Sequence, residues 1–204
     1  MVLASTTSIA APAVQQGDEY TRWPYWEKPS WDPQKVPESL CDLNKEIISY
    51  TCELVNHKMV SVCASRNLTA ETGYIVYRYG LPGNIELAYP KELRNPVGLF
   101  FYSNIWAQLG GQTSLSFFNK PYRYTVFDDW FVKGNDTVYR AGISVKNGRN
   151  GKKVVFQKMC MGNSYYTTSI AGHWGTHFLF DFPPGLNLKT DEFMDVHVTN
   201  ESRN

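Results

Sequence analysis

The sequence predicts an all-β protein, an antiparallel meander of about eight to ten short strands that closes into a sandwich or a barrel. Aromatic residues make up 15% of the chain, and broad rings cover a pleated sheet well. From residue 47 onward, runs rich in β-branched and aromatic residues are broken by turn-forming residues at the spacing typical of all-β domains. Residues 137–146 alternate between apolar and polar side chains, which indicates a strand with one buried face.

The first thirteen residues are predicted to lie outside this fold. They carry no charge and end in Ala11-Pro12-Ala13, which suits the small-residue rule of signal-peptidase sites. We interpret residues 1–13 as the remnant of an export signal, with an ordinary flexible terminus as the alternative.

Residues 14–46 predict an extended arm. The segment is rich in proline and tryptophan, a composition that resists helix and sheet and leaves large rings available for docking. The residues concerned are Trp23, Pro24, Trp26, Pro29, Trp31, Pro33 and Pro37. The rings either pack on the domain's own core or form a stacking platform for a ligand. At the end of the arm, the spacing of Leu40, Leu43 and Ile47 predicts a short helix over residues 38–46.

The β domain is predicted to span residues 47–198, followed by a tail over 199–204. Its candidate strands are 47–55, 59–64, 74–79, 85–89, 98–106, 113–118, 121–127, 137–146, 152–160 and 176–182. Leu81-Pro82-Gly83-Asn84 predicts a tight reversal, and the Asn-Gly-Arg-Asn-Gly run at 147–151 is the clearest hairpin signal in the chain. One face of the sheet is expected to meet solvent or a partner.

Length and charge narrow the class of protein. A chain of 204 residues suits one domain, which would bury roughly 70% of the surface that its unfolded form exposes. Its 20 basic and 19 acidic residues are interspersed and leave a net charge of +1, so no long-range field would attract nucleic acid. No apolar run approaches the roughly 20 residues that a membrane span requires.

The four cysteines, Cys41, Cys52, Cys63 and Cys160, predict two disulfides. They lack the close C-x-x-C spacing of structural zinc sites, and an even count suits an oxidising compartment. Three pairings are possible, and the geometry of the strands ranks them.

The ranking depends on the register of the strands on either side of the turn at 56–58. In the first strand, Ile48, Tyr50, Cys52 and Leu54 alternate onto one face. Matching this face with the apolar face of the second strand pairs Leu54 with Val60. The same register places Cys52 opposite Val62, so Cys63 points to the other face, because successive side chains alternate. We therefore predict a Cys52–Cys160 bond across the core and a Cys41–Cys63 bond that ties down the arm. A two-residue turn would shift the register by one and make Cys52–Cys63 the alternative.

A set of motifs runs through residues 52–160. Cys52 is followed by Ser61-Val62-Cys63-Ala64-Ser65, Gly73-Tyr74-Ile75-Val76-Tyr77-Arg78-Tyr79-Gly80, Glu86-Leu87-Ala88-Tyr89-Pro90, Gly110-Gly111, Leu115-Ser116-Phe117, Tyr122-Arg123-Tyr124-Thr125-Val126 and the stretch 142–160. As a set they resemble a group of small exported bacterial proteins that is usually left uncharacterised. The resemblance implies a signal-bearing, periplasmic or secreted β-rich domain, and it brings no activity or catalytic residues with it. The long arm and Cys41 depart from the group.

Two groups of residues are candidates for a metal site or for acid–base catalysis. His173, His177 and Asp181 would share one face of an extended segment and make a conceivable metal set, although the glycines around them favour a loop with solvated imidazoles. Asp128 and Asp129, followed by Trp130, come directly after a predicted strand and could form an acid–base pair. Adjacent carboxylates in an extended segment point to opposite faces, however, which favours a turn or a solvated edge.

We recognise no catalytic or cofactor-binding motif. The sequence has no G-x-S-x-G elbow, and its glycine pairs lack the Lys-Ser/Thr of a phosphate loop. Three N-x-S/T triplets, at Asn67, Asn135 and Asn200, would matter only if the source glycosylates its exported proteins. The prediction is a non-enzymatic protein without a cofactor.

These features favour a binding function, because rigid aromatic side chains anchor a protein partner at small entropic cost. The leading hypothesis is a non-catalytic periplasmic inhibitor, such as an immunity protein that neutralises a toxic envelope or cell-wall enzyme. It would insert a loop from residues 128–134 or 162–177 into the cleft of that enzyme. The candidate partner-binding residues are Asp128, Asp129, Trp130, His173 and Trp174.

Two alternatives come from other functional classes. A glycan- or peptidoglycan-binding module would stack sugar rings on Trp23, Trp26, Trp31 or Trp174. A metal-dependent hydrolase would use His173, His177 and Asp181.

Overall fold

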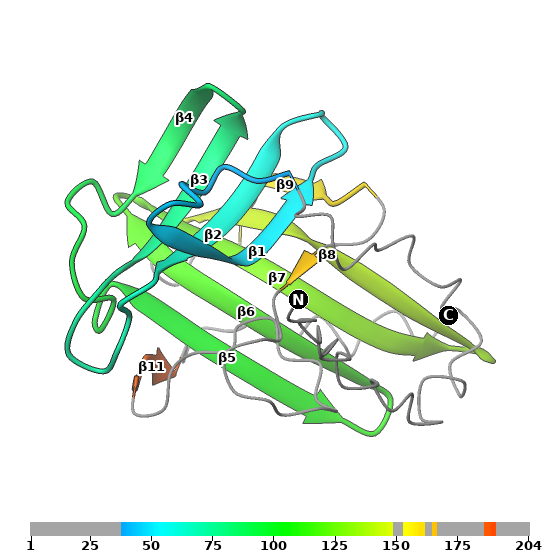
Figure 1. Ribbon diagram of the computed structural model, residues 1–204. Coiled ribbons are helices and arrows are strands. Elements are labelled where there is room, and N and C mark those ends of the chain that lie inside the picture. The colour runs from blue at the N-terminus through cyan, green and yellow to red at the C-terminus, as the bar shows by residue number, and fades with distance from the viewer. Residues whose placement is uncertain (1–37, 149–152, 162–164, 167–185, 191–204) are drawn as a thin grey trace, which may run out of the picture. The chain divides into compact units, whose positions relative to one another are not determined.

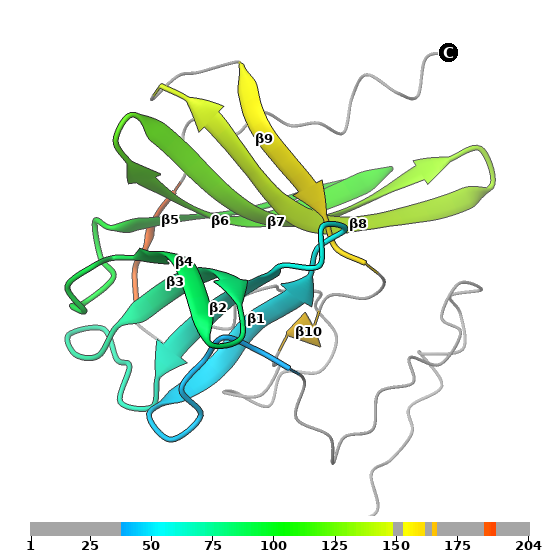
Figure 2. The same ribbon diagram turned by 90° about the horizontal axis from the view of Figure 1, so that it is seen from above.

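Two β-sheets make up the part of the chain that the computed structural model describes, which is residues 38–148, 153–161, 165–166 and 186–190 (Figure 1). The first sheet has the strand order β10-β1-β2-β3-β4 and the second the order β11-β5-β6-β7-β8-β9. The strands are β1 (Glu46–Glu53), β2 (Met59–Ser65), β3 (Ile75–Leu81), β4 (Asn84–Tyr89), β5 (Phe100–Ala107), β6 (Gly110–Asn119), β7 (Tyr122–Lys133), β8 (Asp136–Asn147), β9 (Val154–Met159), β10 (Tyr165–Tyr166) and β11 (Lys189–Thr190). The sheets face each other as a sandwich (Figure 2), which confirms the predicted all-β class.

The strand order follows the predicted meander. Nine predicted strands overlap β1 to β9 in sequence order, and the tenth, 176–182, lies outside the described residues. Neighbouring strands pair antiparallel from β1 to β4 and from β5 to β9. The two-residue strands β10 and β11 were not predicted, and β11 runs parallel to β5. Within the described ranges, no helix is long and apolar enough to cross a membrane.

Aromatic side chains fill the space between the sheets. The ring of Phe117 in β6 stacks on Tyr89 of β4, with centroids 4.2 Å apart, and on Tyr124 of β7 at 5.0 Å. Tyr77 of β3 and Phe100 of β5 pack against the same ring at 5.0 and 5.6 Å. These residues belong to one apolar cluster to which both sheets contribute. The high aromatic content thus serves the core, because each ring buries a large apolar area.

The predicted pairing of β1 with β2 is wrong by two residues. Cys52 lies opposite Val60 rather than Val62, because the turn is centred one residue earlier than predicted. The Leu54 amide donates to the Lys58 carbonyl, and the His57 amide donates to the Leu54 carbonyl. An offset of two leaves every side chain on its predicted face. Cys52 and Cys63 therefore point to opposite faces of the first sheet, as predicted.

A β-bulge near the start of β1 reverses one further assignment. The register shifts between Ile48 and Tyr50, and Ile48 lies opposite Cys63. Ile48 therefore points away from the core cluster that contains Tyr50, although the alternation in the sequence had placed both on one face. The same shift brings Glu46, at the start of the strand, onto the face of Cys63.

The helix predicted over residues 38–46 is absent. The segment makes a single turn, in which the amides of Lys45 and Glu46 donate to the carbonyl of Asp42. Before that turn the chain crosses the first sheet, where the amide of Leu40 donates to Ser61 Oγ at 3.0 Å. Pairing with the sheet satisfies backbone groups that a helix would have satisfied internally. Tertiary contacts thus override the apolar spacing.

The end of β9 joins the two sheets at one corner. Cys160 donates its amide to Ala141 of β8 in the second sheet, while Met161 donates to Glu53 of β1 in the first. The crossing requires Gly142, since a Cβ at that position would lie 2.3 Å from the carbonyl oxygen of Lys158. A glycine therefore permits the chain to pass from one sheet to the other.

Candidate functional site

Both predicted disulfides are present. Cys41 is bonded to Cys63 and Cys52 to Cys160, with Cα–Cα distances of 5.6 and 5.7 Å. The Cys52–Cys160 bond crosses between the sheets at the β9 corner, and the Cys41–Cys63 bond attaches the segment before β1 to the outer face of the first sheet. Two disulfides are typical of proteins from an oxidising, extracytoplasmic environment.

The predicted pair Asp128 and Asp129, with Trp130, lies in the middle of β7 rather than in a turn or at an edge. β7 continues to Lys133 because it is paired on both sides, with β6 as far as Phe131 and with β8 throughout. The interpretation as a turn or solvated edge is therefore wrong. The two carboxylates lie on opposite faces, as predicted: Asp128 is opposite Thr113 and Asp129 is opposite Gln112.

Asp129 forms a buried ion pair instead of a catalytic site. Arg140 of β8 donates through Nε to Asp129 Oδ1 at 2.9 Å and through Nη2 to Oδ2 at 3.0 Å. Asp129 is only 3% exposed, and the Arg140 guanidinium also lies 4.6 Å from the centroid of the Phe131 ring. A bidentate pair of this kind fixes two neighbouring strands. The carboxylate is thereby occupied within the fold.

The β7–β8 hairpin extends past its neighbours beyond this ion pair (Figure 2). β6 pairs with β7 as far as Phe131, the Val132 amide donates to the carbonyl of Leu109 just before β6, and β9 pairs with β8 only from Gly142 onward. Only the last pair, Lys133 with Asp136, therefore lies beyond both neighbouring strands. Residues 133–136 are exposed, and Gly134 has a positive φ of 63°, which suits the turn of a two-residue hairpin.

Asp128 and Trp130 lie on the other face of β7, where β7 is paired with β6, beside polar side chains of β5 and β6. Trp130 covers Gly111 of β6, because a Cβ on that glycine would lie 2.6 Å from the indole Nε1. Thr113 Oγ1 donates to Asn104 Oδ1 at 3.2 Å on the same face. The arrangement places a half-buried indole beside hydroxyl, amide and carboxylate groups.

A charged cluster on the outer face of the first sheet was missed in the sequence. Arg78 donates from Nη1 to Glu46 Oε2 at 2.5 Å and from Nη2 to Oε1 at 2.7 Å. The Glu46 carboxylate also accepts the Tyr74 hydroxyl at 3.1 Å and the Asp42 amide at 2.8 Å. Glu46 is 1% exposed. A clue lies in the strand pattern, where an arginine stands between two core tyrosines, Tyr77 and Tyr79.

The electrostatic consequences follow from these contacts. The hydrogen bond from Arg78 to Glu46, reinforced by the negative charge of Glu46, raises the pKa of the guanidinium against the opposing effect of burial. Burial, together with the nearby Glu46 charge, raises the pKa of the Tyr74 hydroxyl. Both groups thus keep their protons in the fold, and the cluster is a satisfied ion pair.

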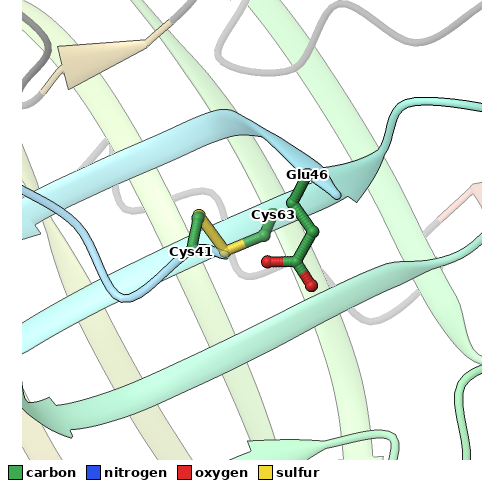
Figure 3. A group of neighbouring side chains, drawn as sticks. All are labelled: Cys41, Glu46 and Cys63. Carbon is green, nitrogen blue, oxygen red and sulfur yellow. A yellow bond between two sulfur atoms is a disulfide. The ribbon is translucent and has the colours of Figure 1, made fainter. Parts of the chain in front are cut away.

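Cys41, Cys63 and Glu46 also bring three residues of metal-ligating types together, with ligand atoms within 4.8 Å of one another (Figure 3). A metal ion would bind these two cysteines only as thiolates, but their sulfur atoms are joined in the disulfide. The carboxylate is bound by Arg78. In the oxidised chain this cluster is therefore a disulfide beside an ion pair.

Several predicted site residues lie outside the described residues. They are the metal set His173, His177 and Asp181, the partner residue Trp174, the arm tryptophans Trp23, Trp26 and Trp31, and Asn200. The export-signal remnant and the loop at 162–177 fall there for the most part as well. Of the other N-x-S/T positions, Asn67 and Asn135 are both exposed.

The chain was compared with protein families, curated proteins and solved structures. No family model, no curated protein and no solved structure matches it. The function is therefore inferred from the geometry of the described residues.

Proposed function

We propose that the protein is a non-catalytic periplasmic inhibitor that inserts the tip of the β7–β8 hairpin, residues 133–136, into the cleft of an envelope or cell-wall enzyme, as an immunity protein would. The observation that carries the proposal is the overhang of this hairpin past β6 and β9 (Figure 2). A narrow ribbon reaches into a concave site that the broad face of a sheet cannot enter.

The base of the hairpin is suited to this task. The Asp129–Arg140 ion pair and the packing of Arg140 on Phe131 join the two strands just below the overhang. A braced hairpin loses little conformational freedom when it binds. The tip itself is exposed, and nothing lies within 4 Å of a Cβ built at Gly134.

Export to the periplasm is the second part of the proposal. The two disulfides support it, because such bonds persist in oxidising compartments. Fractionation of the native host tests it: the protein is expected in the periplasmic or secreted fraction, and recovery with reduced cysteines from the cytoplasm would count against it.

Inhibition can be tested with the host's own wall enzymes. Purified protein is added at micromolar concentration to an envelope extract that degrades insoluble peptidoglycan, and the rate of solubilisation is measured. The wild type is expected to lower this rate. A tip variant, Lys133→Ala/Asn135→Ala/Asp136→Ala, is expected to need at least about tenfold more protein for the same effect, as for the loss of an interface hot spot.

A matched variant controls for general effects of surface mutation. Pro82→Ala/Asn84→Ala alters the equally exposed β3–β4 turn and is expected to inhibit like the wild type. Both variants should keep the wild-type stability within about 0.5 kcal/mol. A wild type that does not inhibit, or a tip variant as potent as the wild type, would contradict the proposal.

A second candidate, a glycan-binding module, is favoured by one observation. Trp130 lies over Gly111 on a face that also carries Asn104, Thr113 and Asp128, and sugars are bound by aromatic rings flanked by polar groups. Co-sedimentation with insoluble peptidoglycan distinguishes the two. Binding that Trp130→Ala abolishes and the tip variant leaves intact would replace the inhibitor proposal with this one.

A further inference from the structure

The two residues of the Cys41–Cys63 bond differ in their exposure to solvent. Cys63 is fully buried in β2, at 0% exposure, whereas Cys41 is half-buried in the segment before β1. A thiolate breaks a disulfide by attacking one sulfur while the other leaves. Access therefore favours attack at Cys41, with Cys63 as the leaving group.

The leaving sulfur lies beside a cation. Arg78 Nη1 is 3.3 Å from Cys63 Sγ, in hydrogen-bonding reach for sulfur. A hydrogen bond from a charged donor stabilises a thiolate, and a stabilised thiolate leaves faster. The more exposed residue, Cys41, and the better leaving group, Cys63, are thus the two partners of the same bond.

We propose that Cys41–Cys63 is an exchange site for small aliphatic thiols, at which Cys41 becomes S-thiolated while Arg78 holds Cys63 as a thiolate. The incoming thiolate forms a new S–S bond with Cys41 Sγ, and the electron pair of the old bond leaves with Cys63 Sγ. One disulfide is exchanged for another, so no further oxidant or reductant is required.

The fold can accommodate the opened bond. The segment before β1 stays on the sheet through hydrogen bonds from Leu40 to Ser61 Oγ, from Thr51 Oγ1 to Glu38 and from Arg78 Nη1 to the Leu40 carbonyl. Glu46 keeps its two bonds from Arg78. Exchange thus removes a covalent link while the sandwich core, on the opposite face of the sheet, is left unaltered.

The second disulfide is an internal comparison. It also joins a half-buried cysteine, Cys160, to a buried one, Cys52 at 4% exposure. The group beside its sulfur atoms is the neutral hydroxyl of Tyr50, 3.1 Å from Cys160 Sγ and 3.4 Å from Cys52 Sγ. Each bond therefore joins one half-buried and one buried cysteine. The two bonds differ in the charge of the neighbouring hydrogen-bond donor, which is the Arg78 cation in one and the Tyr50 hydroxyl in the other.

The test is a time course of the folded, oxidised protein with reduced glutathione as the probe. Samples are quenched in acid and mapped by peptide mass spectrometry. The first adduct is expected on Cys41, with Cys63 free and Cys52–Cys160 intact, and at a rate about tenfold above that of the second disulfide. A first adduct on Cys63, Cys52 or Cys160, or reaction of both bonds at one common rate, would overturn the proposal.

Two variants test the effect of the Arg78 charge on the exchange rate, apart from the exposure of Cys41. Glu46→Gln/Arg78→Gln removes the cation without leaving a buried carboxylate, and it is expected to slow the exchange about three- to tenfold. Glu46→Gln alone keeps Arg78 beside Cys63 and is expected to exchange at least as fast as the wild type. Exchange of the double variant at the wild-type rate would refute the role of Arg78. Mapping of the wild type decides the site of attack even where a variant fails to fold.

Discussion

The two faces of the first sheet carry different kinds of side chain. The core face presents Tyr50, Cys52 and Tyr77 to the aromatic cluster between the sheets. The outer face presents the ion pair of half-buried Arg78 with buried Glu46, beside the disulfide of the buried Cys63. Neighbouring residues of one strand, such as Tyr77 and Arg78, thus enter opposite environments because side chains alternate.

The contrast separates two ways of holding the fold together. On the core face, apolar burial is supplemented by a disulfide that links residues 108 apart in sequence and joins the two sheets. On the outer face, a disulfide of separation 22 and a buried ion pair attach one short segment. The loss of a contact should therefore lower the free energy of unfolding most on the core face.

The largest loss is expected for Cys52→Ala/Cys160→Ala. The bond closes a long loop, and its removal should lower the free energy of unfolding by about 4–5 kcal/mol through the entropy gained by the unfolded chain. Urea denaturation of the oxidised proteins measures it. A loss below that of the corresponding Cys41/Cys63 variant would reverse the proposed ranking of the two faces.

Arg78→Ala is expected to come next. It leaves the Glu46 carboxylate, 1% exposed, without its bidentate partner, and breaking such a pair costs about 3–5 kcal/mol. Glu46→Gln/Arg78→Gln, which leaves no unpaired charge, should be less destabilised than the single variant in the same urea titration. Equal losses would mean that the charge is better solvated than its burial indicates.

Cys41→Ala/Cys63→Ala should cost about 3 kcal/mol, because the closed loop is shorter. The core is expected to stay packed in this variant, since the bond lies on the outer face. Near-ultraviolet circular dichroism of the aromatic cluster tests this. A lost aromatic signal at low temperature would show that the outer disulfide is needed for the sandwich itself.

The smallest effect is a pH dependence on the core face. Burial raises the pKa of the Tyr77 hydroxyl far above its ordinary value of 10.0, so the folded chain keeps this proton while the unfolded chain loses it. Stability is therefore fully present below pH 10 and falls as the pH rises above it, by up to about 1.4 kcal/mol per pH unit for one such group. Tyr77→Phe should flatten the alkaline decline in urea titrations between pH 9 and 11. An unchanged slope would mean that Tyr77 is accessible.

The sequence predicted the parts of the candidate sites that depend on local pattern. Alternation placed Asp128 and Asp129 on opposite faces of an extended segment, and it ranked a Cys52–Cys63 bond below the pairing that the structure shows. Both conclusions survived an error of two residues in the register, since an even offset preserves the face of each side chain. The helix over 38–46 failed because contacts with the sheet, which are distant in sequence, outweigh local spacing.

What the sequence determined by itself is the all-β class, the approximate strands and the opposite facing of Cys52 and Cys63, because the period-two burial pattern can be read in each strand separately. Only the tertiary structure decided which charged groups meet. Glu46 reaches Arg78 through the pairing of three strands and a bulge, and Asp129 reaches Arg140 because the register of β7 and β8 places the two residues directly opposite each other. Such partners depend on strand order and register, which are set by the packing of the whole sandwich.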